Sequence, residues 1–384
     1  MKIIGHWSYQ FLLKNLWNDF IKKMNREIEI KWERIKKFLK ENNLNGVLLN
    51  KVANFAWFTG GKSNFVSLHT EIGASSLLIT NKKIYFISNN IEFPRMIKEE
   101  IGNFNFENIS FPWYQDKMKA VVKKIAGDKV GSDKPDREFI PVSIENLHFP
   151  LLEEEIKRYK QLGKESSTIM TEICKNIRQG DKEIEIAGKL SKRLWELKII
   201  PVVILIAGDE RIKNFRHPLP TSKKIKKYVM VVLCAKRDGL IVSLTRIVHF
   251  GKIPKNLKNK HFAVCKVDAC FINETITGKK IGEVFRNALE IYKETGYKNE
   301  WKLHHQGGLT GYLTRYYKGY KNLNIIIEEN QAFAWNPSIT GTKSEDTIIT
   351  TKIGSEIISE DKNWPMIEIK YKNKILLRPD ILQM

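Results

Sequence analysis

The residues best suited to chemistry lie between positions 301 and 347. Two histidines, His304 and His305, precede a pair of glycines, and Glu345 follows Lys343 some forty positions later. Glycines let backbone and ligand approach closely, and functional sites draw on several separate strands and loops. An imidazole titrates near neutral pH and therefore serves as a general acid or base. We expect these side chains to converge on one polar site that transfers a proton.

A third histidine stands apart from this segment. His217 lies in the loop F-R-H-P-L-P, residues 215–220, directly before two prolines that disfavour regular structure. Its ring is a candidate general acid or base, and a surface histidine without a role is the alternative. His304 is expected behind the site, and a core histidine bonded to backbone is the alternative for His305.

Three short strings in the chain resemble the metal-binding motifs of one enzyme family. H-Q-G-G begins at His305, N-P-S at Asn336 and K-S-E-D at Lys343. They resemble the H-x-x-G, E-P-G and R-x-E-D strings of the pita-bread enzymes, which include Xaa-Pro aminopeptidases, prolidases, methionine aminopeptidases and creatinase. The resemblance covers roughly residues 26–360. It implies an α/β N-terminal domain of the creatinase type, followed by an α+β pita-bread domain.

The resemblance also shows where the chain departs from the peptidases. Their five metal ligands are two Asp, one His and two Glu, and the matching positions here hold Val232, Ser243, His305, Asn336 and Glu345. Valine cannot coordinate a metal, and neutral Ser or Asn is a weak ligand where carboxylates are needed. We therefore predict no metal site of the peptidase type and no cofactor.

Creatinase cleaves a C–N bond without a metal, and its resemblance to this chain implies a set of roles. His217 takes the place of the proton-shuttling histidine, while His305 and Glu345 would position substrate or water. The hydroxyl of Tyr312 would donate to a developing oxyanion, and Arg246 or Lys343 would pair with Glu345. Trp57 lies in a segment that, in this family, can reach the active site of a partner subunit, and a core aromatic residue before a glycine turn is the alternative. The predicted substrate-binding residues are Tyr312, Asn336, Arg246, Lys343, Trp57 and Ser243.

Three functions stay open at this stage. The leading one is a metal-independent hydrolase of a C–N bond in a small amide, amidine or proline-like substrate. The second is a non-catalytic pita-bread protein that binds a peptide or a protein partner. The third is an Xaa-Pro metallopeptidase with one metal held by His305 and Glu345.

The elements that must position these residues are predicted by periodicity. Residues 25–43 carry apolar side chains at helical spacing, and helices alternate with short strands to about residue 140. We expect residues 1–24 to be an amphipathic helical extension, residues 25–148 the N-terminal α/β domain, and residues 149–384 the pita-bread domain. The family resemblance implies a homodimer that acts on a small molecule or short peptide.

Composition narrows the function classes further. The 384 residues carry a formal charge of +22, but the lysines are spread along the chain and not clustered beside aromatic residues, so we expect no specific nucleic-acid binding. No apolar run is long enough to span a membrane, and no signal peptide is evident. Four cysteines without zinc-site spacing are typical of a reduced, cytoplasmic protein.

Overall fold

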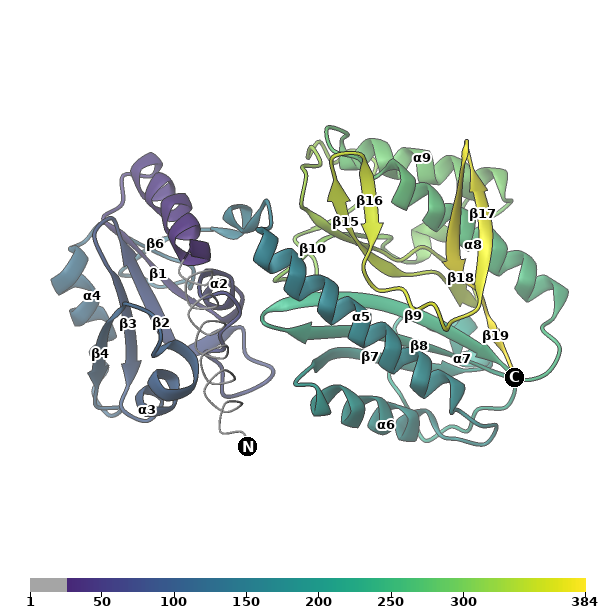
Figure 1. Cartoon of the computed structure of the whole chain (residues 1–384), viewed down its shortest axis with the longest axis horizontal. Coiled ribbons are helices and arrows are strands. Elements are labelled where there is room, and N and C mark those ends of the chain that lie inside the picture. The colour runs from purple at the N-terminus through teal and green to yellow at the C-terminus, as the bar shows by residue number, and fades with distance from the viewer. Residues whose placement is uncertain (1–25) are drawn as a thin grey trace, which may run out of the picture. The chain divides into compact units, whose positions relative to one another are not determined.

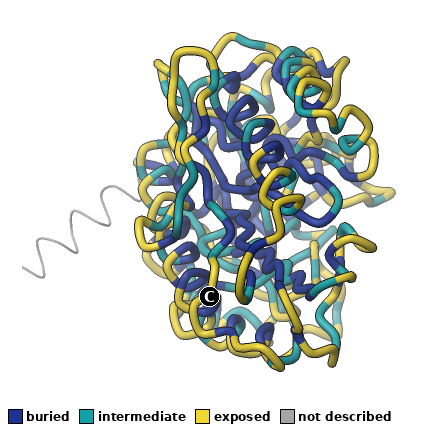
Figure 2. Tube along the Cα trace, turned by 90° about the vertical axis from the view of Figure 1, so that its right-hand side faces the viewer, coloured by how far each residue is buried: buried dark blue, intermediate teal, exposed yellow. Residues whose placement is uncertain are grey.

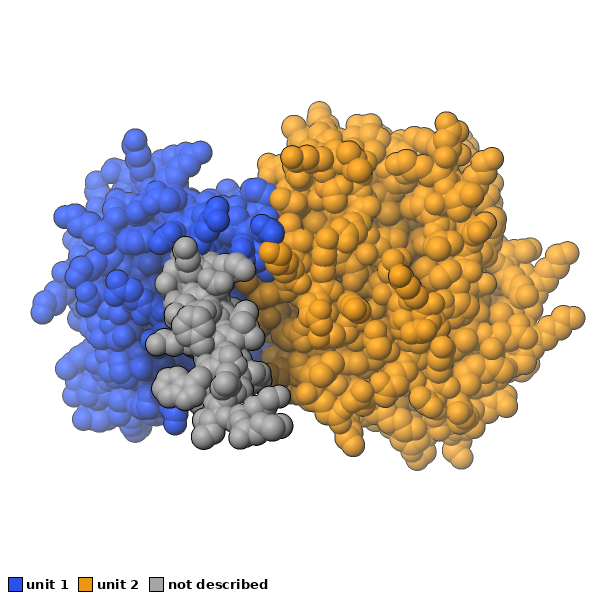
Figure 3. Space-filling view, in the orientation of Figure 1, with its two compact units in different colours: residues 1–154 blue, residues 155–384 orange. Residues whose placement is uncertain are grey.

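The computed structural model of the protein describes residues 26–384, so the predicted helix in residues 1–24 lies outside the described residues. The chain divides into two compact units, residues 1–154 and residues 155–384, which Figure 3 draws in two colours. Within the described residues, no helix combines the length and the apolar composition needed to cross a membrane.

The first unit is built on one mixed sheet of six strands in the order β4-β3-β2-β1-β5-β6. The predicted helix occupies residues 26–41, and the predicted hairpin is formed by β2 and β3, which pair antiparallel. The helix follows from its apolar residues at helical spacing, and the strands follow from short apolar runs bounded by turn residues. The elements are β1 Gly46–Lys51, α2 Val52–Phe58, β2 Ile72–Thr80, β3 Ile84–Asn89, α3 Phe93–Arg95, β4 Glu107–Phe111, α4 Met118–Ala126, β5 Val130–Ser132 and β6 Ile140–Pro141.

The second unit contains two main sheets, one of four strands in the order β19-β9-β8-β7 and one of five in the order β11-β10-β12-β15-β16. Figure 1 shows α5 and α6 beside the first sheet and α8 and α9 beside the second. The helices are α5 Glu153–Lys175, α6 Glu183–Glu196, α7 Glu210–Asn214, α8 Lys255–Glu274 and α9 Ile281–Glu294. The strands of the first sheet are β7 Ile200–Gly208, β8 Tyr228–Arg237, β9 Leu240–His249 and β19 Leu382–Gln383.

The strands of the second sheet are β10 Gly307–Thr310, β11 Tyr317–Lys318, β12 Ala332–Trp335, β15 Asp346–Thr351 and β16 Gly354–Ile357. Two further hairpins accompany it, formed by β13 Ser338–Ile339 with β14 Thr342–Lys343, and by β17 Met366–Tyr371 with β18 Lys374–Pro379. This arrangement confirms the predicted fold class, an α/β unit followed by an α+β pita-bread unit.

The central strand β9 is buried along its whole length, and buried residues line the interior in Figure 2. Its apolar, β-branched sequence explains why it forms a strand covered on both faces. Four of its residues are nevertheless polar: Ser243, Thr245, Arg246 and, at its end, His249. Because successive side chains of a strand point to opposite faces, Ser243 and Thr245 share one face and Arg246 lies on the other. This parity decides which of them reaches the candidate site.

Candidate functional site

Three histidines from two separate segments meet in the second unit. His217 follows α7, whereas His304 and His305 follow the short helix Glu300–Leu303 and precede β10. The Nε2 atoms of His217 and His304 are 3.1 Å apart. The ring centroid of His305 lies 4.4 Å from that of His304 and 5.8 Å from that of His217. His304 is buried and His217 is exposed, so the cluster opens to solvent through His217.

The loop that carries the two adjacent histidines is held by its neighbours. The side chain of Gln306 donates to the carbonyl oxygens of His304 and Trp301, at 2.5 and 3.3 Å, and accepts from the Tyr292 hydroxyl at 2.6 Å. The N–H of Gly307 donates to Nδ1 of His305 at 3.3 Å. These contacts fix the direction in which both imidazoles leave the backbone.

Gly307 is required where the strand β10 begins. Its φ is +92°, and a Cβ atom placed there would lie 2.1 Å from the carbonyl oxygen of Ala334. No side chain fits at that separation, so only glycine lets β10 pair with β12 immediately after His305. Gly180 has the same φ of +92° with nothing within 4 Å of such a Cβ, which makes it a matched control.

We expect Gly307→Ala to destabilise the protein by about 1–3 kcal/mol more than Gly180→Ala. Both substitutions impose the same backbone strain, and only the first adds a collision with β12. Urea unfolding of the two variants measures the difference. Equal midpoints for the two would show that β10 moves to accommodate the methyl group without cost.

Glu345 lies in a buried polar cluster close to the histidines. Its Oε2 accepts from the Thr245 hydroxyl at 2.6 Å and pairs with Nζ of Lys343 at 2.7 Å, and its Oε1 is 3.8 Å from the Arg315 guanidinium. Burial opposes ionisation of this carboxyl, but the charges of Lys343 and Arg315 outweigh it and hold its pKa below the ordinary value. Glu345 is therefore an anion that is already fully paired.

The imidazoles are neutral at pH 7. Burial lowers the pKa of His304 to about 2 and that of His305 to about 4, and nearby positive charges, Lys343 and Arg315 among them, add to the effect. Burial also lowers the pKa of His217, and here Lys343 and Glu345 act in opposite directions. The Glu345 carboxylate thus influences His217 directly. A neutral imidazole can accept a proton, as a general base must.

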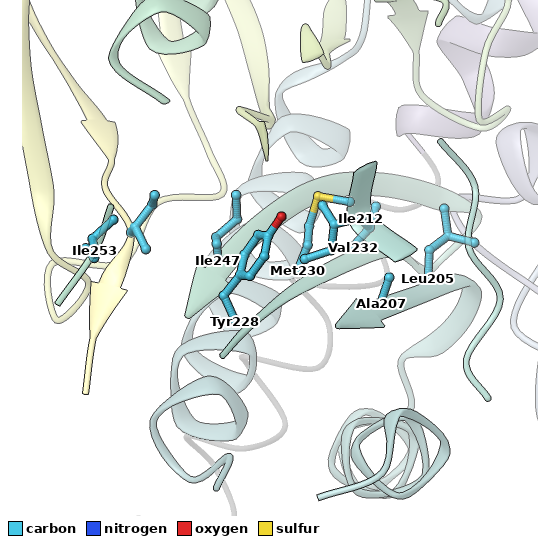
Figure 4. Close-up of a cluster of buried hydrophobic side chains, with 9 residues drawn as sticks. Leu205, Ala207, Ile212, Tyr228, Met230, Val232, Ile247 and Ile253 are labelled. Carbon is cyan, nitrogen blue, oxygen red and sulfur yellow. The ribbon is translucent and has the colours of Figure 1, made fainter. Parts of the chain in front are cut away.

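The positions that would hold two metal ions are not equipped to do so. Val232 belongs to an apolar cluster with Leu205, Met230 and Ile247 on one face of the β7-β8-β9 sheet (Figure 4). Ser243 is fully buried, and its hydroxyl lies 3.2 Å from the Cys234 thiol. An apolar side chain and a thiol beside a serine are not the carboxylate ligands that a hard dinuclear centre needs. The residues present do not fit such a centre.

Asn336 occupies the third replaced position. It follows the last paired residue of β12, where Trp335 is opposite Asp346, so it stands beside Glu345. Its side chain is 3% exposed, and among the described residues its Oδ1 atom has no hydrogen-bond partner. A buried acceptor without a donor costs free energy. Among the buried polar atoms of the described residues, this oxygen is therefore one whose hydrogen-bonding capacity is unused.

Two of the predicted substrate-binding residues, Arg246 and Ser243, are assigned wrongly. The side chain of Arg246 lies on the other face of β9, and that of Ser243 is fully buried. Arg246 points to the face opposite Thr245 and donates to Asp346 at 3.1 Å and to the carbonyl of Ser359 at 3.0 Å. It does not pair with Glu345. Ser243 lies on the correct face but is 0% exposed, so it is covered by the side chains above it and does not contact a ligand.

Two aromatic predictions are also wrong. The segment around Trp57 forms helix α2, and the Trp57 side chain is 0% exposed and stacks on His148 with a centroid distance of 4.9 Å. It belongs to the core of the first unit and cannot extend to a partner. The Tyr312 hydroxyl donates to Glu155 at 2.7 Å and the residue is 2% exposed, so the hydroxyl does not serve an oxyanion.

Sequence reasoning gave little weight to three residues that the structure places at the site. His304, expected behind the site, contacts His217 directly. Thr245 binds Glu345, and Arg315 lies beside that carboxylate. The alternation of polar residues along β9 was the available signal for Thr245. Nothing in the sequence indicated that residues 217 and 304 would meet.

Comparison with known proteins gives a consistent result. The model of metallopeptidase family M24 matches residues 157–354. An uncharacterized peptidase of Staphylococcus epidermidis is 21% identical over 363 residues, which cover 86% of this chain and 99% of the relative.

Among solved structures, an Xaa-Pro dipeptidase from Bacillus anthracis has a TM-score of 0.75 at 21% identity, with 93% of this chain and 100% of that chain covered. A prolidase from Pyrococcus horikoshii has a TM-score of 0.73 at 21% identity, with 86% and 98% covered. These likenesses show that the two-unit fold is shared.

Proposed function

Because the chain belongs to metallopeptidase family M24 but holds Val232, Ser243 and Asn336 at positions matched to metal ligands, we propose that it is a hydrolase that works without the family's pair of metal ions. Its substrate is a small amide, amidine or proline-containing peptide, cleaved at a C–N bond. The observation that supports the proposal is the meeting of His217 with His304 and His305, from two distant segments, in one cluster of imidazoles that opens to solvent.

His217 is the proton carrier in this proposal. Its neutral ring takes a proton from a water molecule as the water oxygen attacks the carbonyl or amidine carbon, and it then delivers that proton to the nitrogen of the breaking C–N bond. The 3.1 Å contact with His304 orients the ring. Because the ring is exposed, both water and substrate can reach it.

The remaining groups bind and polarise the substrate. Lys343 is a buried cation beside Glu345 and offers positive charge to the oxygen that becomes negative during attack. The Oδ1 atom of Asn336, which has no donor among the described residues, accepts an N–H of the substrate.

We expect His217→Ala to reduce turnover by about 10²–10⁴-fold, the usual contribution of general acid–base catalysis. The measurement is a hydrolysis assay with Xaa-Pro dipeptides and small amides and amidines, in buffer containing a chelator. His69→Ala is the control, because His69 is an exposed histidine of the first unit. Unchanged turnover in His217→Ala would contradict the assigned role. Turnover only after addition of metal would contradict independence from metal.

A second function is favoured by the state of Glu345. Lys343, Thr245 and Arg315 already satisfy its carboxylate, which leaves it little capacity to activate water. A non-catalytic protein that binds a peptide at this site would have no need of a free carboxylate. Isothermal titration with the same dipeptides separates the two: binding without turnover, weakened by Lys343→Ala and unaffected by His217→Ala, would establish the binding protein.

The same family resemblance supports a cytoplasmic homodimer as part of the proposal. The structure describes one chain, so the assembly is a matter for solution measurement. Light scattering on the purified protein distinguishes a dimer from a monomer. A monomer at micromolar concentration would contradict the proposed homodimer and would leave the proposed chemistry unchanged.

A further inference from the structure

We propose that His217, His304 and His305 form a binding site for a single transition-metal ion, which shares only His305 with the positions matched to the family's dinuclear centre. Each histidine offers one ring nitrogen, and these three nitrogens all lie within 4.8 Å of one another. Three imidazoles that leave one coordination position open are a donor set that binds Zn²⁺ in proteins. Val232 and Ser243 take no part in it, so their loss does not affect it.

The spacing of the nitrogens is close to that of a metal site. In a tetrahedral zinc site with Zn–N bonds of about 2.0–2.1 Å, two ligand nitrogens lie about 3.3 Å apart. The Nε2 atoms of His217 and His304 are 3.1 Å apart. Without an ion, one of these nitrogens must donate a proton to the other. With an ion between them, both lone pairs point at it, and only His305 has to move closer.

His305 must move toward the other two rings when an ion binds, and this movement breaks one hydrogen bond of its ring. Its Nδ1 accepts from the N–H of Gly307 at 3.3 Å, which is long for such a bond. Coordination through Nε2 moves the ring proton to Nδ1 and breaks this contact, whereas coordination through Nδ1 replaces the amide proton by the ion. Either route sacrifices one weak hydrogen bond, and a new metal–nitrogen bond compensates for it.

The surroundings determine which ions fit. Imidazole nitrogen suits Zn²⁺, Cu²⁺ and Ni²⁺, whereas Mg²⁺, Ca²⁺ and Mn²⁺ prefer oxygen ligands. The exposed ring of His217 provides the path of entry. Lys343 and Arg315 neutralise Glu345 close by, so the ion is expected to carry a bound anion or hydroxide at its open position.

A bound ion would also regulate the proposed hydrolysis, a consequence that depends on the proposed function. A neutral His217 ring that holds a metal through Nε2 carries its proton on Nδ1, so it has no nitrogen left to accept a proton from water. Loading the site is therefore expected to inhibit turnover. In this respect the chain would differ from a metallopeptidase, in which the ion is needed.

The test uses the full chain without a histidine tag, stripped with a chelator and titrated with Zn²⁺ by calorimetry and by competition with a chromophoric chelator. We expect one ion per chain, and a loss of affinity of about 100-fold or more in His304→Ala and in His217→Ala. Mg²⁺ is expected to give no saturable binding. His69→Ala is the control and is expected to bind as the unaltered chain does.

His217→Ala keeps the test decisive if the buried His304 variant fails to fold, because His217 is exposed. Absence of saturable Zn²⁺ binding, or binding that His217→Ala leaves unchanged, would overturn the site. If the stripped protein also hydrolyses substrate, the proposed function stands without the metal site. If Zn²⁺ binds in the expected ratio and hydrolysis requires it, the metal site stands and the metal-free function falls.

Discussion

Replacing Arg378 by methionine is expected to destabilise the protein by about 3–5 kcal/mol, because it leaves two buried carboxylates without their shared cation. Arg378 is 0% exposed and its Nη2 atom lies 2.6 Å from Asp268 and 2.7 Å from Asp346. Asp346 is also bound by Arg246, at 3.1 Å. The side chains of Asp268, Arg378, Asp346 and Arg246 form a continuous chain of buried ion pairs. This chain joins α8, β18, β15 and β9.

This network lies directly behind the candidate site. Asp346 and Arg246 are the chain neighbours of Glu345 and Thr245, and they point to the opposite side of their strands. Loss of the network would therefore weaken the placement of the site as well as the unit itself. Burial raises the pKa of Asp268 despite its cationic partner.

The measurement is urea unfolding of Arg378→Met beside a matched surface variant. Arg193→Met removes an arginine that pairs with Glu172 at 3.0 Å where both side chains are about two-fifths exposed, and we expect it to cost about 0–1 kcal/mol. The double variant Arg378→Met with Asp268→Asn is expected to recover part of the loss, since one stranded charge is removed. Similar unfolding midpoints for the Arg378 and Arg193 variants would show that the buried network contributes nothing beyond a surface pair.

Lowering the pH from 7 to 5 is expected to destabilise the metal-free protein by about 4 kcal/mol through two buried histidines alone. Burial lowers the pKa of His148 to about 3, although the charge of Glu145 opposes it, and lowers that of His304 to about 2. In the unfolded chain both would titrate near pH 6.5.

The direction follows from proton uptake. Below pH 6.5 the unfolded chain binds protons at these histidines, whereas the folded chain keeps them neutral until the pH approaches 3 and 2. The stability contributed by each group is therefore complete above pH 6.5 and is lost as the pH falls toward its folded value. At pH 5 each histidine costs about 2 kcal/mol.

The variant His148→Phe isolates the contribution of His148 to the pH dependence of the unfolding free energy. Phenylalanine retains the stacking on Trp57 but cannot titrate, so the difference in unfolding free energy between pH 7 and pH 5 should shrink by about 2 kcal/mol. Urea unfolding in chelator at both pH values measures it, since bound metal would add a second dependence on pH. An unaltered slope in His148→Phe would mean that the imidazole is already protonated when folded.

Much of the fold could be predicted from the sequence because its signals are local. The helix at residues 26–41 and the hairpin of β2 and β3 follow from apolar spacing and turn residues. The strings at His305, Asn336 and Lys343 indicated family and fold class together. The prediction that Val232, Ser243 and Asn336 stand in place of Asp and Glu ligands also came from the sequence, since a ligand is lost with its functional group.

The partners of the charged residues were decided only by the tertiary structure. Neighbours such as Glu345 and Asp346 point to opposite faces, so Lys343 pairs with the first and Arg246 with the second. Composition cannot reveal this, because it depends on the parity and register of β9 and β15. The same holds for Tyr312 and Trp57, whose polar or aromatic character suggested a ligand but whose neighbours enclose them.

The sequence by itself determined the family and the fold class, because both are written in residue identity and short-range spacing, and it predicts the loss of the carboxylate ligands. Only the tertiary structure brought His217 to His304, more than eighty residues away, and left the Asn336 oxygen without a donor among the described residues. Contacts across such separations depend on how strands and loops pack in space, and no local pattern encodes them.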